Sequence, residues 1–207
     1  MTFKERVHIE ITKGAAVYKA VFINFEYLIF SNDFKIKPYY IIRAEEDNYP
    51  HLTGVRILLS AQDFYNACLN GTLKEADFDF ISTSRTEKEV IGSVRRKIQV
   101  LPLLSTFFAN SLQAEEGFSK GSVHCSLATA DNSLTIGFVD VAVLRPKTLL
   151  KKNELNSQKA ADVTLILRRN RGADKFDTIM QGDIKGFSAL YQEILCENIG
   201  GCSAKGV

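Results

Sequence analysis

The chain has 207 residues, of which 45% are hydrophobic and 24% charged, and this is close to the composition of ordinary soluble globular proteins. A net charge of +2 is too small to indicate a nucleic-acid-binding protein by itself, although a local basic patch remains open. No stretch reaches the roughly 18–20 apolar residues that span a bilayer, and the N-terminus lacks the order of a secretory signal, so we expect a soluble protein that is not exported.

The four cysteines are scattered along the chain, without the spacing of a zinc site or a disulfide framework. They are Cys68, Cys125, Cys196 and Cys202. This usage favours a reducing cytoplasm.

The first half of the chain alternates helical and extended patterns. Apolar residues at three-and-four spacing predict a short helix over residues 10–25. Two β-like runs follow at Tyr27–Phe30 and Tyr39–Ala44, and then a polar turn, Pro50–Val55, which contains His51. A second helix is expected after Ser60, which forms a capping box with Asp63, and it should end at Gly71.

The longest predicted helix runs from about Glu87 to Gln113. Val90, Val94 and Ile98 lie on its apolar face. Pro102 should kink this helix or split it in two, because proline cannot donate the helical hydrogen bond.

After residue 120 the hydrophobic period changes from 3.6 to 2. Alternating runs around Val123, Leu134, Val163 and Phe176 predict a four-stranded antiparallel β-meander, with a long polar loop from Arg145 to Asp162. The fold class is therefore α+β, in which N-terminal helices precede the meander, cover one of its faces and leave the other open.

His51 is the strongest candidate for proton transfer, because an imidazole titrates near neutral pH and a loop held by rigid neighbours suits such a group. The alternative interpretation is a turn histidine that bonds its own backbone.

Basic and hydroxylic side chains complete the candidates. In the long helix, Arg95 and Lys97 flank the apolar face, whereas Arg96 points to the opposite side. The polar phase of the meander, which includes His124, Ser126 and Arg168 and has Arg169 nearby, gives a mildly positive face. The RNA-binding candidates are these four residues and Arg95 of the helix. For each of these residues a plain solvated surface position is the alternative.

Carboxylates are dispersed, and no Cys/His set has ligand spacing, so we expect no metal and no cofactor. A histidine and cations without metal ligands suit metal-independent RNA cleavage. In that reaction the 2′-hydroxyl of the substrate attacks the adjacent phosphorus, and cations stabilise the transition state.

Four short segments occur in a characteristic order: Tyr49-Pro50-His51-Leu52-Thr53-Gly54-Val55, Phe64-Tyr65, Arg96-Lys97 and Pro146-Lys147-Thr148-Leu149-Leu150. This order resembles the phage-associated Barnase–EndoU–colicin E5/D–RelE-like (BECR-fold) nucleases, in the branch with a Pro-His-Leu-Thr-Gly motif. The resemblance covers roughly residues 35–180. It implies N-terminal helices followed by a four-stranded antiparallel sheet, in agreement with the order of elements above. We expect a helical and extended segment at 1–34, a BECR-like nuclease domain at 35–195 and, because the end of the chain is rich in glycine and serine, a flexible tail at 196–207.

The resemblance also implies a metal-independent endoribonuclease that acts as a toxin or phage-defence effector, with RNA as substrate and an antitoxin or inhibitor protein as a possible partner. By motif position, the catalytic residues would be His51, Thr53, Lys97 and Thr148. The alternative is a non-catalytic module that binds RNA or protein on the same scaffold, as an immunity or regulatory factor.

Overall fold

The computed structural model describes residues 1–184, so the predicted tail lies outside the described residues. Its first element, helix α1 (Phe3–Tyr18), begins seven residues earlier than predicted and continues as a π-helical turn, η1 (Lys19–Ile23). The reason is a capping box at the N-terminus, where the Thr2 hydroxyl accepts from the Glu5 N–H and the Glu5 carboxylate accepts from the Thr2 N–H.

The next helices agree better with the sequence patterns. Helix α3 (Ala61–Asn70) is capped by Ser60 and ends at Gly71, as predicted. The long helix is split at Pro102, also as predicted, into α4 (Glu87–Val100) and the 3₁₀ segment η4 (Leu101–Ala109). Gln113, the predicted end of the long helix, instead begins a strand.

The prediction of a four-stranded meander is wrong, because the main sheet has nine strands in the order β11-β5-β8-β9-β10-β2-β1-β12-β13. The bounds of its strands are β1 (Phe25–Phe30), β2 (Tyr39–Ile42), β5 (Gln113–Glu116), β8 (Leu127–Ala130), β9 (Leu134–Asp140), β10 (Leu144–Lys151), β11 (Ala161–Asp162), β12 (Leu165–Asn170) and β13 (Thr178–Gln181). The four predicted strands correspond to β8, β9, β12 and β13, but β10, β2 and β1 lie between the two pairs.

Strand β10 differs most from the sequence prediction, because it occupies the start of the segment from Arg145 to Asp162, which was predicted to be a loop. It pairs antiparallel with β9, and a register shift between Pro146 and Thr148 marks a bulge. Proline is tolerated at bulges, where the ladder lacks a hydrogen bond, so Pro146 did not prevent a strand.

Short elements connect these parts. They are the 3₁₀ turns η2 (Glu46–Asn48) and η3 (Glu75–Asp77), helix α2 (Tyr49–Thr53), the strand pair β3 (Arg56–Ile57) and β4 (Phe78–Asp79), and the hairpin of β6 (Ser119–Lys120) and β7 (Val123–His124).

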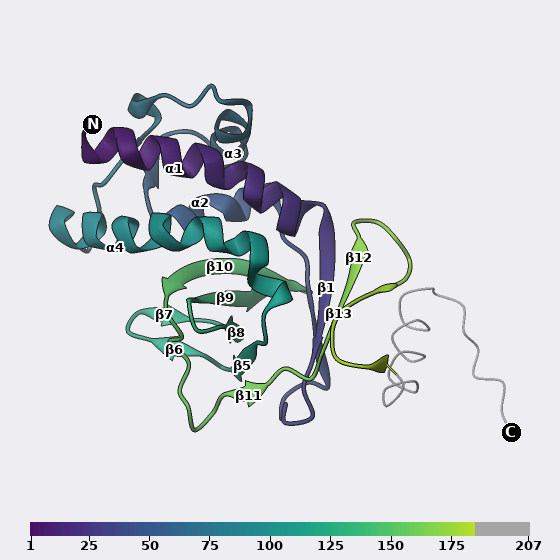
Figure 1. Cartoon of the computed structure of the whole chain (residues 1–207). Helices are drawn as coiled ribbons and strands as arrows, with labels where there is room; N and C mark the ends of the chain where they lie inside the picture. The colour runs from purple at the N-terminus through teal and green to yellow at the C-terminus, as the bar shows by residue number, and fades with distance from the viewer. Residues whose placement is uncertain (185–207) are drawn as a thin grey trace, which may run out of the picture.

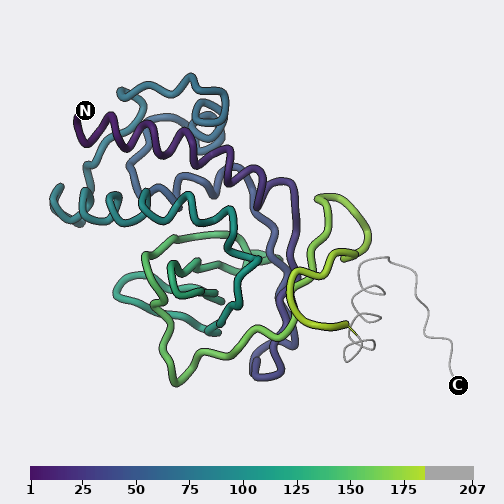
Figure 2. Tube along the Cα trace, in the orientation of Figure 1, coloured from purple at the N-terminus to yellow at the C-terminus, as the bar shows by residue number. Residues whose placement is uncertain are grey.

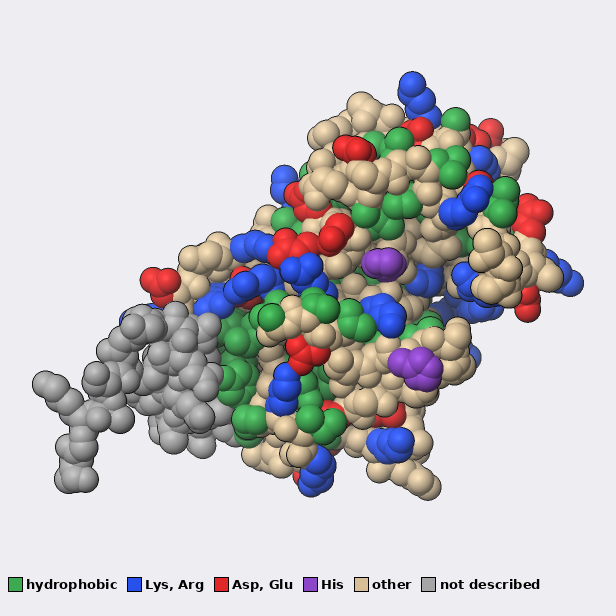
Figure 3. Space-filling model, turned by 180° about the vertical axis from the view of Figure 1, so that it is seen from behind, with side chains coloured by type: hydrophobic (Ala, Val, Ile, Leu, Met, Phe, Trp, Pro, Cys, Tyr) green, Lys and Arg blue, Asp and Glu red, His purple; other side chains and the backbone are tan. Residues whose placement is uncertain are grey.

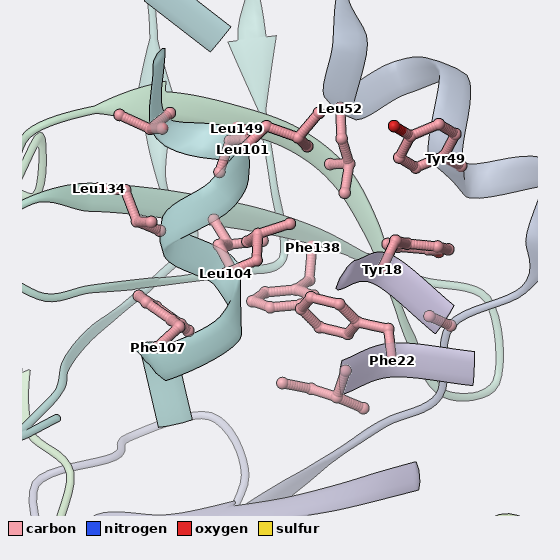
Figure 4. Close-up of a cluster of buried hydrophobic side chains, with 14 of the residues drawn as sticks. Tyr18, Phe22, Tyr49, Leu52, Leu101, Leu104, Phe107, Leu134, Phe138 and Leu149 are labelled. Atoms are coloured by element: carbon pink, nitrogen blue, oxygen red, sulfur yellow. The ribbon is translucent and has the colours of Figure 1, made fainter. Parts of the chain in front are cut away.

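The four α-helices of the described residues gather on one side of strands β8 to β10, and β1, β12 and β13 form one end of the sheet (Figure 1). Helices α1 and α4 run side by side, and α4 lies between α1 and the sheet, where it packs on β10 (Figure 2). Residues from both ends of the described chain fill one core, and Figure 4 labels Tyr18, Phe22, Tyr49, Leu52, Leu101, Leu104, Phe107, Leu134, Phe138 and Leu149 in it. The helical N-terminal segment therefore packs into the same core as the predicted nuclease domain.

Among residues 1–184, no helix combines the length and the apolar character that a membrane span requires.

Candidate active site

His51 lies on a short helix and not in the turn that the sequence predicted. Pro50 stands in the first turn of α2, where its fixed φ suits a helix start. Gly54 ends the helix in the left-handed conformation, with φ 79°, and its N–H donates to the Pro50 carbonyl at 3.2 Å. Within this single turn the His51 side chain is exposed, whereas Leu52 and Thr53 are buried.

Helices α2 and α4 meet beside the bulge in β10. Strand β10 pairs with β2 only at Leu144↔Ile42, so the two strands diverge beyond that point. Both helices pack on β10. The bulge between Pro146 and Thr148 places Lys147 as the extra, exposed residue, while Thr148 is buried. The end of α2 is therefore close to an irregular part of the central strand.

Lys97 connects these elements. Its side chain is 9% exposed, and Nζ donates to the His51 carbonyl oxygen at 2.6 Å and lies 3.5 Å from the Thr148 hydroxyl. Among the described residues no carboxylate forms an ion pair with it. Burial lowers the pKa of Lys97 to about 8, and the charge of Arg85 acts in the same direction. The structure thus brings together three of the four predicted catalytic residues, His51, Lys97 and Thr148.

Gly54 makes room for Lys97. A Cβ built at Gly54 would lie 2.8 Å from Cδ of Lys97, a distance that real Cβ atoms do not reach. Glycine is therefore required here both for its positive φ and for the close approach of the lysine stem.

Thr53, the fourth predicted catalytic residue, is fully buried. Its hydroxyl donates to the Pro50 carbonyl at 2.8 Å. The contacts of Thr53 therefore stabilise the end of α2, and its side chain does not reach the surface beside His51.

The surroundings of His51 favour the neutral imidazole. Partial loss of solvent is the main cause that lowers its pKa, and the charge of Lys97 lowers it further. Asp47 acts in the opposite direction, and Lys147 adds the smallest lowering effect. The pKa therefore lies below the ordinary value of 6.5, and at neutral pH His51 can accept a proton.

Sequence reasoning did not single out Lys147, because its segment looked like a polar loop. Its ammonium donates to the His124 carbonyl at 3.0 Å. Nδ1 of His124 lies 3.0 Å from the Ser119 hydroxyl, across the β6–β7 hairpin. Lys147 therefore lies close to both exposed histidines, His51 and His124, and one face of the molecule carries two histidine side chains with basic side chains nearby (Figure 3).

The other predicted RNA-binding residues have contacts elsewhere. The guanidinium groups of Arg95 and Arg168 lie over the rings of Phe3 and Phe25, at 5.3 and 4.3 Å from the centroids. Arg169 is buried at 5% exposure and pairs with Glu26 on β1. RNA binding by Arg95 and Arg168 stays a prediction, whereas burial and pairing give Arg169 a role inside the sheet.

Ser126 lies next to this site in sequence, two residues after His124. Its hydroxyl accepts from the Asp140 N–H at 3.1 Å, between β8 and β9. RNA binding by Ser126 also stays a prediction.

A family model described as phage-Barnase-EndoU-ColicinE5/D-RelE like nuclease4 matches residues 10–185. The chain belongs to this nuclease family. The match includes α2, α4 and β10, and it confirms at family level the resemblance that the sequence motifs indicated. No curated protein and no solved structure matches the chain.

The nuclease has no group of three or more His, Cys, Asp and Glu side chains placed to hold a metal ion, as far as residues 1–184 are concerned. The charged groups that act on His51 are the ammonium of Lys97, the carboxylate of Asp47 and the ammonium of Lys147. Ammonium groups can stabilise a phosphate.

Proposed function

We propose that this nuclease is a metal-independent endoribonuclease that cleaves RNA through attack of the substrate's own 2′-hydroxyl. The observation that carries the proposal is an exposed imidazole with a lowered pKa beside two ammonium groups, Lys97 and Lys147. A neutral histidine is the proton acceptor that this reaction needs, and the cations suit a phosphorane-like transition state.

In the proposed mechanism, His51 accepts the proton of the 2′-hydroxyl as the 2′-oxygen bonds to phosphorus. The bond between phosphorus and the 5′-oxygen breaks, and the leaving oxygen takes a proton from an acid. We assign that acid to His124, because Lys147, whose charge acts on His51, also donates to the backbone carbonyl of His124. The products are a 2′,3′-cyclic phosphate and a 5′-hydroxyl, so DNA is not a substrate.

Lys97 has a structural and an electrostatic role in this proposal. Its hydrogen bond to the His51 carbonyl holds the end of α2, and its charge keeps the imidazole neutral. Thr148 positions the ammonium group from β10. Lys147 is exposed and is the cation that contacts the phosphate oxygens directly.

The biological role that we propose is a toxin or phage-defence effector, which an antitoxin or inhibitor protein would block by covering His51. The second candidate, a binding module without catalysis, would use the same basic surface. Expression separates the two, since wild-type protein should halt growth and His51→Ala protein, at an equal level, should not. Equal, harmless expression of both would favour the binding module.

The test of the chemistry uses an oligonucleotide with one ribonucleotide in a DNA background. Cleavage should occur only at that position, leave a 2′,3′-cyclic phosphate and persist in excess EDTA. His51→Ala should lower kcat by about 10²- to 10⁴-fold, the usual contribution of general acid–base catalysis. Arg96→Ala, an exposed substitution on α4, should change kcat little. Cutting of a 2′-deoxy or 2′-O-methyl site, or loss of activity with EDTA and recovery with magnesium, would refute the proposal.

A further inference from the structure

Arg145 on β10 has a guanidinium group that forms few hydrogen bonds and ion pairs with the described residues. Its side chain is 34% exposed, but Nε is buried and has no hydrogen-bond partner within the described part of the chain. Its one ion pair, from Nη2 to Oε1 of Glu45, is 4.0 Å long. The same carboxylate oxygen accepts at 2.6 Å from Arg171, so Glu45 is already held by another arginine.

This arrangement is costly for the free protein. A buried N–H without a partner loses its hydration and gains no bond in return. A guanidinium also presents its donors as a rigid fork, which fits two oxygens of one carboxylate or phosphate. The contact with Glu45 leaves this fork largely unused, because its distance exceeds that of a hydrogen bond.

The position of Arg145 relates it to the candidate site. Arg145 and Lys147 are two residues apart on one strand, which separates them by roughly 6–7 Å at about 3.3 Å per residue. Both side chains are at least partly exposed, whereas Pro146 between them is buried. Glu45 immediately precedes η2, which leads into the helix that carries His51. Arg145 therefore lies next to the candidate site along β10, toward the beginning of the strand.

We propose that Arg145 binds the RNA phosphate adjacent to the scissile one, with the Glu45 carboxylate as its weak substitute in the free protein. The proposal rests on the proposed function, and it adds a substrate-binding subsite to it. RNA would follow β10 from Arg145 to Lys147, with neighbouring phosphates on these two cations. Arg145 would supply affinity and register and would take no part in proton transfer.

The experiment compares substrates with different numbers of phosphates. A dinucleoside monophosphate has only the scissile phosphate, and trinucleotides extended on the 5′ or the 3′ side add one neighbour each. Arg145→Gln should raise KM about tenfold for one of the two trinucleotides, leave kcat unchanged and leave the dinucleotide unaffected. Arg96→Gln, which removes an exposed charge on α4, is the matched control and should alter none of these values.

Binding of a non-cleavable 2′-deoxy oligonucleotide gives a readout that does not need catalysis. Removal of one phosphate contact should reduce the slope of log Kd against log salt by about 0.7, the value for a single strand. Arg145→Lys should keep this salt dependence and lose part of the affinity, because it retains the charge without the fork.

Two kinds of failure are distinguishable. If wild-type protein cleaves none of the substrates, the proposed function is wrong, and the binding measurement still tests Arg145. If cleavage is normal but Arg145→Gln affects all substrates equally, or leaves KM and the salt slope unchanged, Arg145 is not the adjacent-phosphate subsite. A thermal unfolding curve for each variant shows whether an equal loss of activity on all substrates is caused by partial unfolding of the variant.

Discussion

Two buried cations in this molecule have opposite surroundings. Arg169 on β12 lies directly across from Glu26 on β1, and both side chains of this ion pair are almost completely buried, at 5% and 3% exposure. Burial alone would raise the pKa of Glu26, but hydrogen bonds from Arg43 and Arg169 outweigh it and lower the pKa. Lys97 is comparably buried, yet within residues 1–184 its ammonium has only neutral oxygens as hydrogen-bond partners.

The difference distinguishes a structural charge from a reactive one. The charge of Arg169 is compensated by Glu26, so the pair belongs to the structure of the sheet. The charge of Lys97 is uncompensated, and its pKa of about 8 therefore lies near neutral pH. Such perturbed groups concentrate at functional sites.

Replacing each cation with methionine should give the largest contrast. Lys97→Met should lower kcat by about 10²-fold, because α2 loses the hydrogen bond that positions His51, and leave the free energy of unfolding equal or higher. Arg169→Met should cost about 3–5 kcal/mol of stability, because Glu26 stays buried with one partner fewer. Urea unfolding and kcat measured on the folded fraction separate the two effects. An equal loss of stability in both variants would contradict the comparison.

The pH dependence should give the next largest effect. Activity should fall about tenfold per unit above pH 8 as Lys97 loses its proton, and also below the lowered pKa of His51, which lies under 6.5. Stability should change in the opposite direction on the alkaline side. Between pH 8 and 10.5 the unfolded chain binds more protons at this lysine than the native chain, so its contribution to stability rises with pH.

Activity and thermal unfolding measured from pH 5 to 10 test both halves of this prediction. A loss of activity above pH 8 that coincides with unfolding would show that Lys97 titration is not its cause. In Lys97→Met protein the residual activity should lack the alkaline decrease.

Two glycines with similar backbone conformations offer the smallest and most selective test. Gly54 and Gly71 have φ values of 79° and 69°, so alanine at either position should cost about 1–2 kcal/mol of backbone strain. Only Gly54 faces Lys97, whereas a Cβ at Gly71 meets nothing within 4 Å. Gly54→Ala should therefore also reduce kcat, by about tenfold. Equal kcat in the two variants would show that the position of Lys97 is unimportant.

The sequence predicted those features that depend on local chemistry. Ser60 and Gly71 mark the ends of α3, and Pro102 divides the long helix, because caps and proline act within one turn. The helical phase also placed Lys97 correctly at the edge of the buried face of α4.

Features that depend on tertiary contacts were not predictable in this way. The single turn of α2 is too short to give a periodic signal, so His51 looked like a loop residue. The strand around Pro146 looked like a loop because its polar residues and proline hid the pairing with β9. The bond from Lys97 to the His51 carbonyl joins residues 46 positions apart, and no spacing rule indicates it.

The bulge in β10 keeps Leu144 and Leu149 on the same side of the strand. Both leucines face the main core, although five positions separate them and a regular strand would turn them to opposite sides. Leu150, by contrast, packs against the separate cluster of Phe118, Cys125 and Ala128. Deletion of Lys147 would therefore remove a cation without moving the core. Leu144 and Leu149 would then be four positions apart in a regular strand, and Leu149 would still lie opposite Ile136 on β9. The bulge is thus the place where β10 can lose one residue, and with it a charge of the site, while both leucines stay buried.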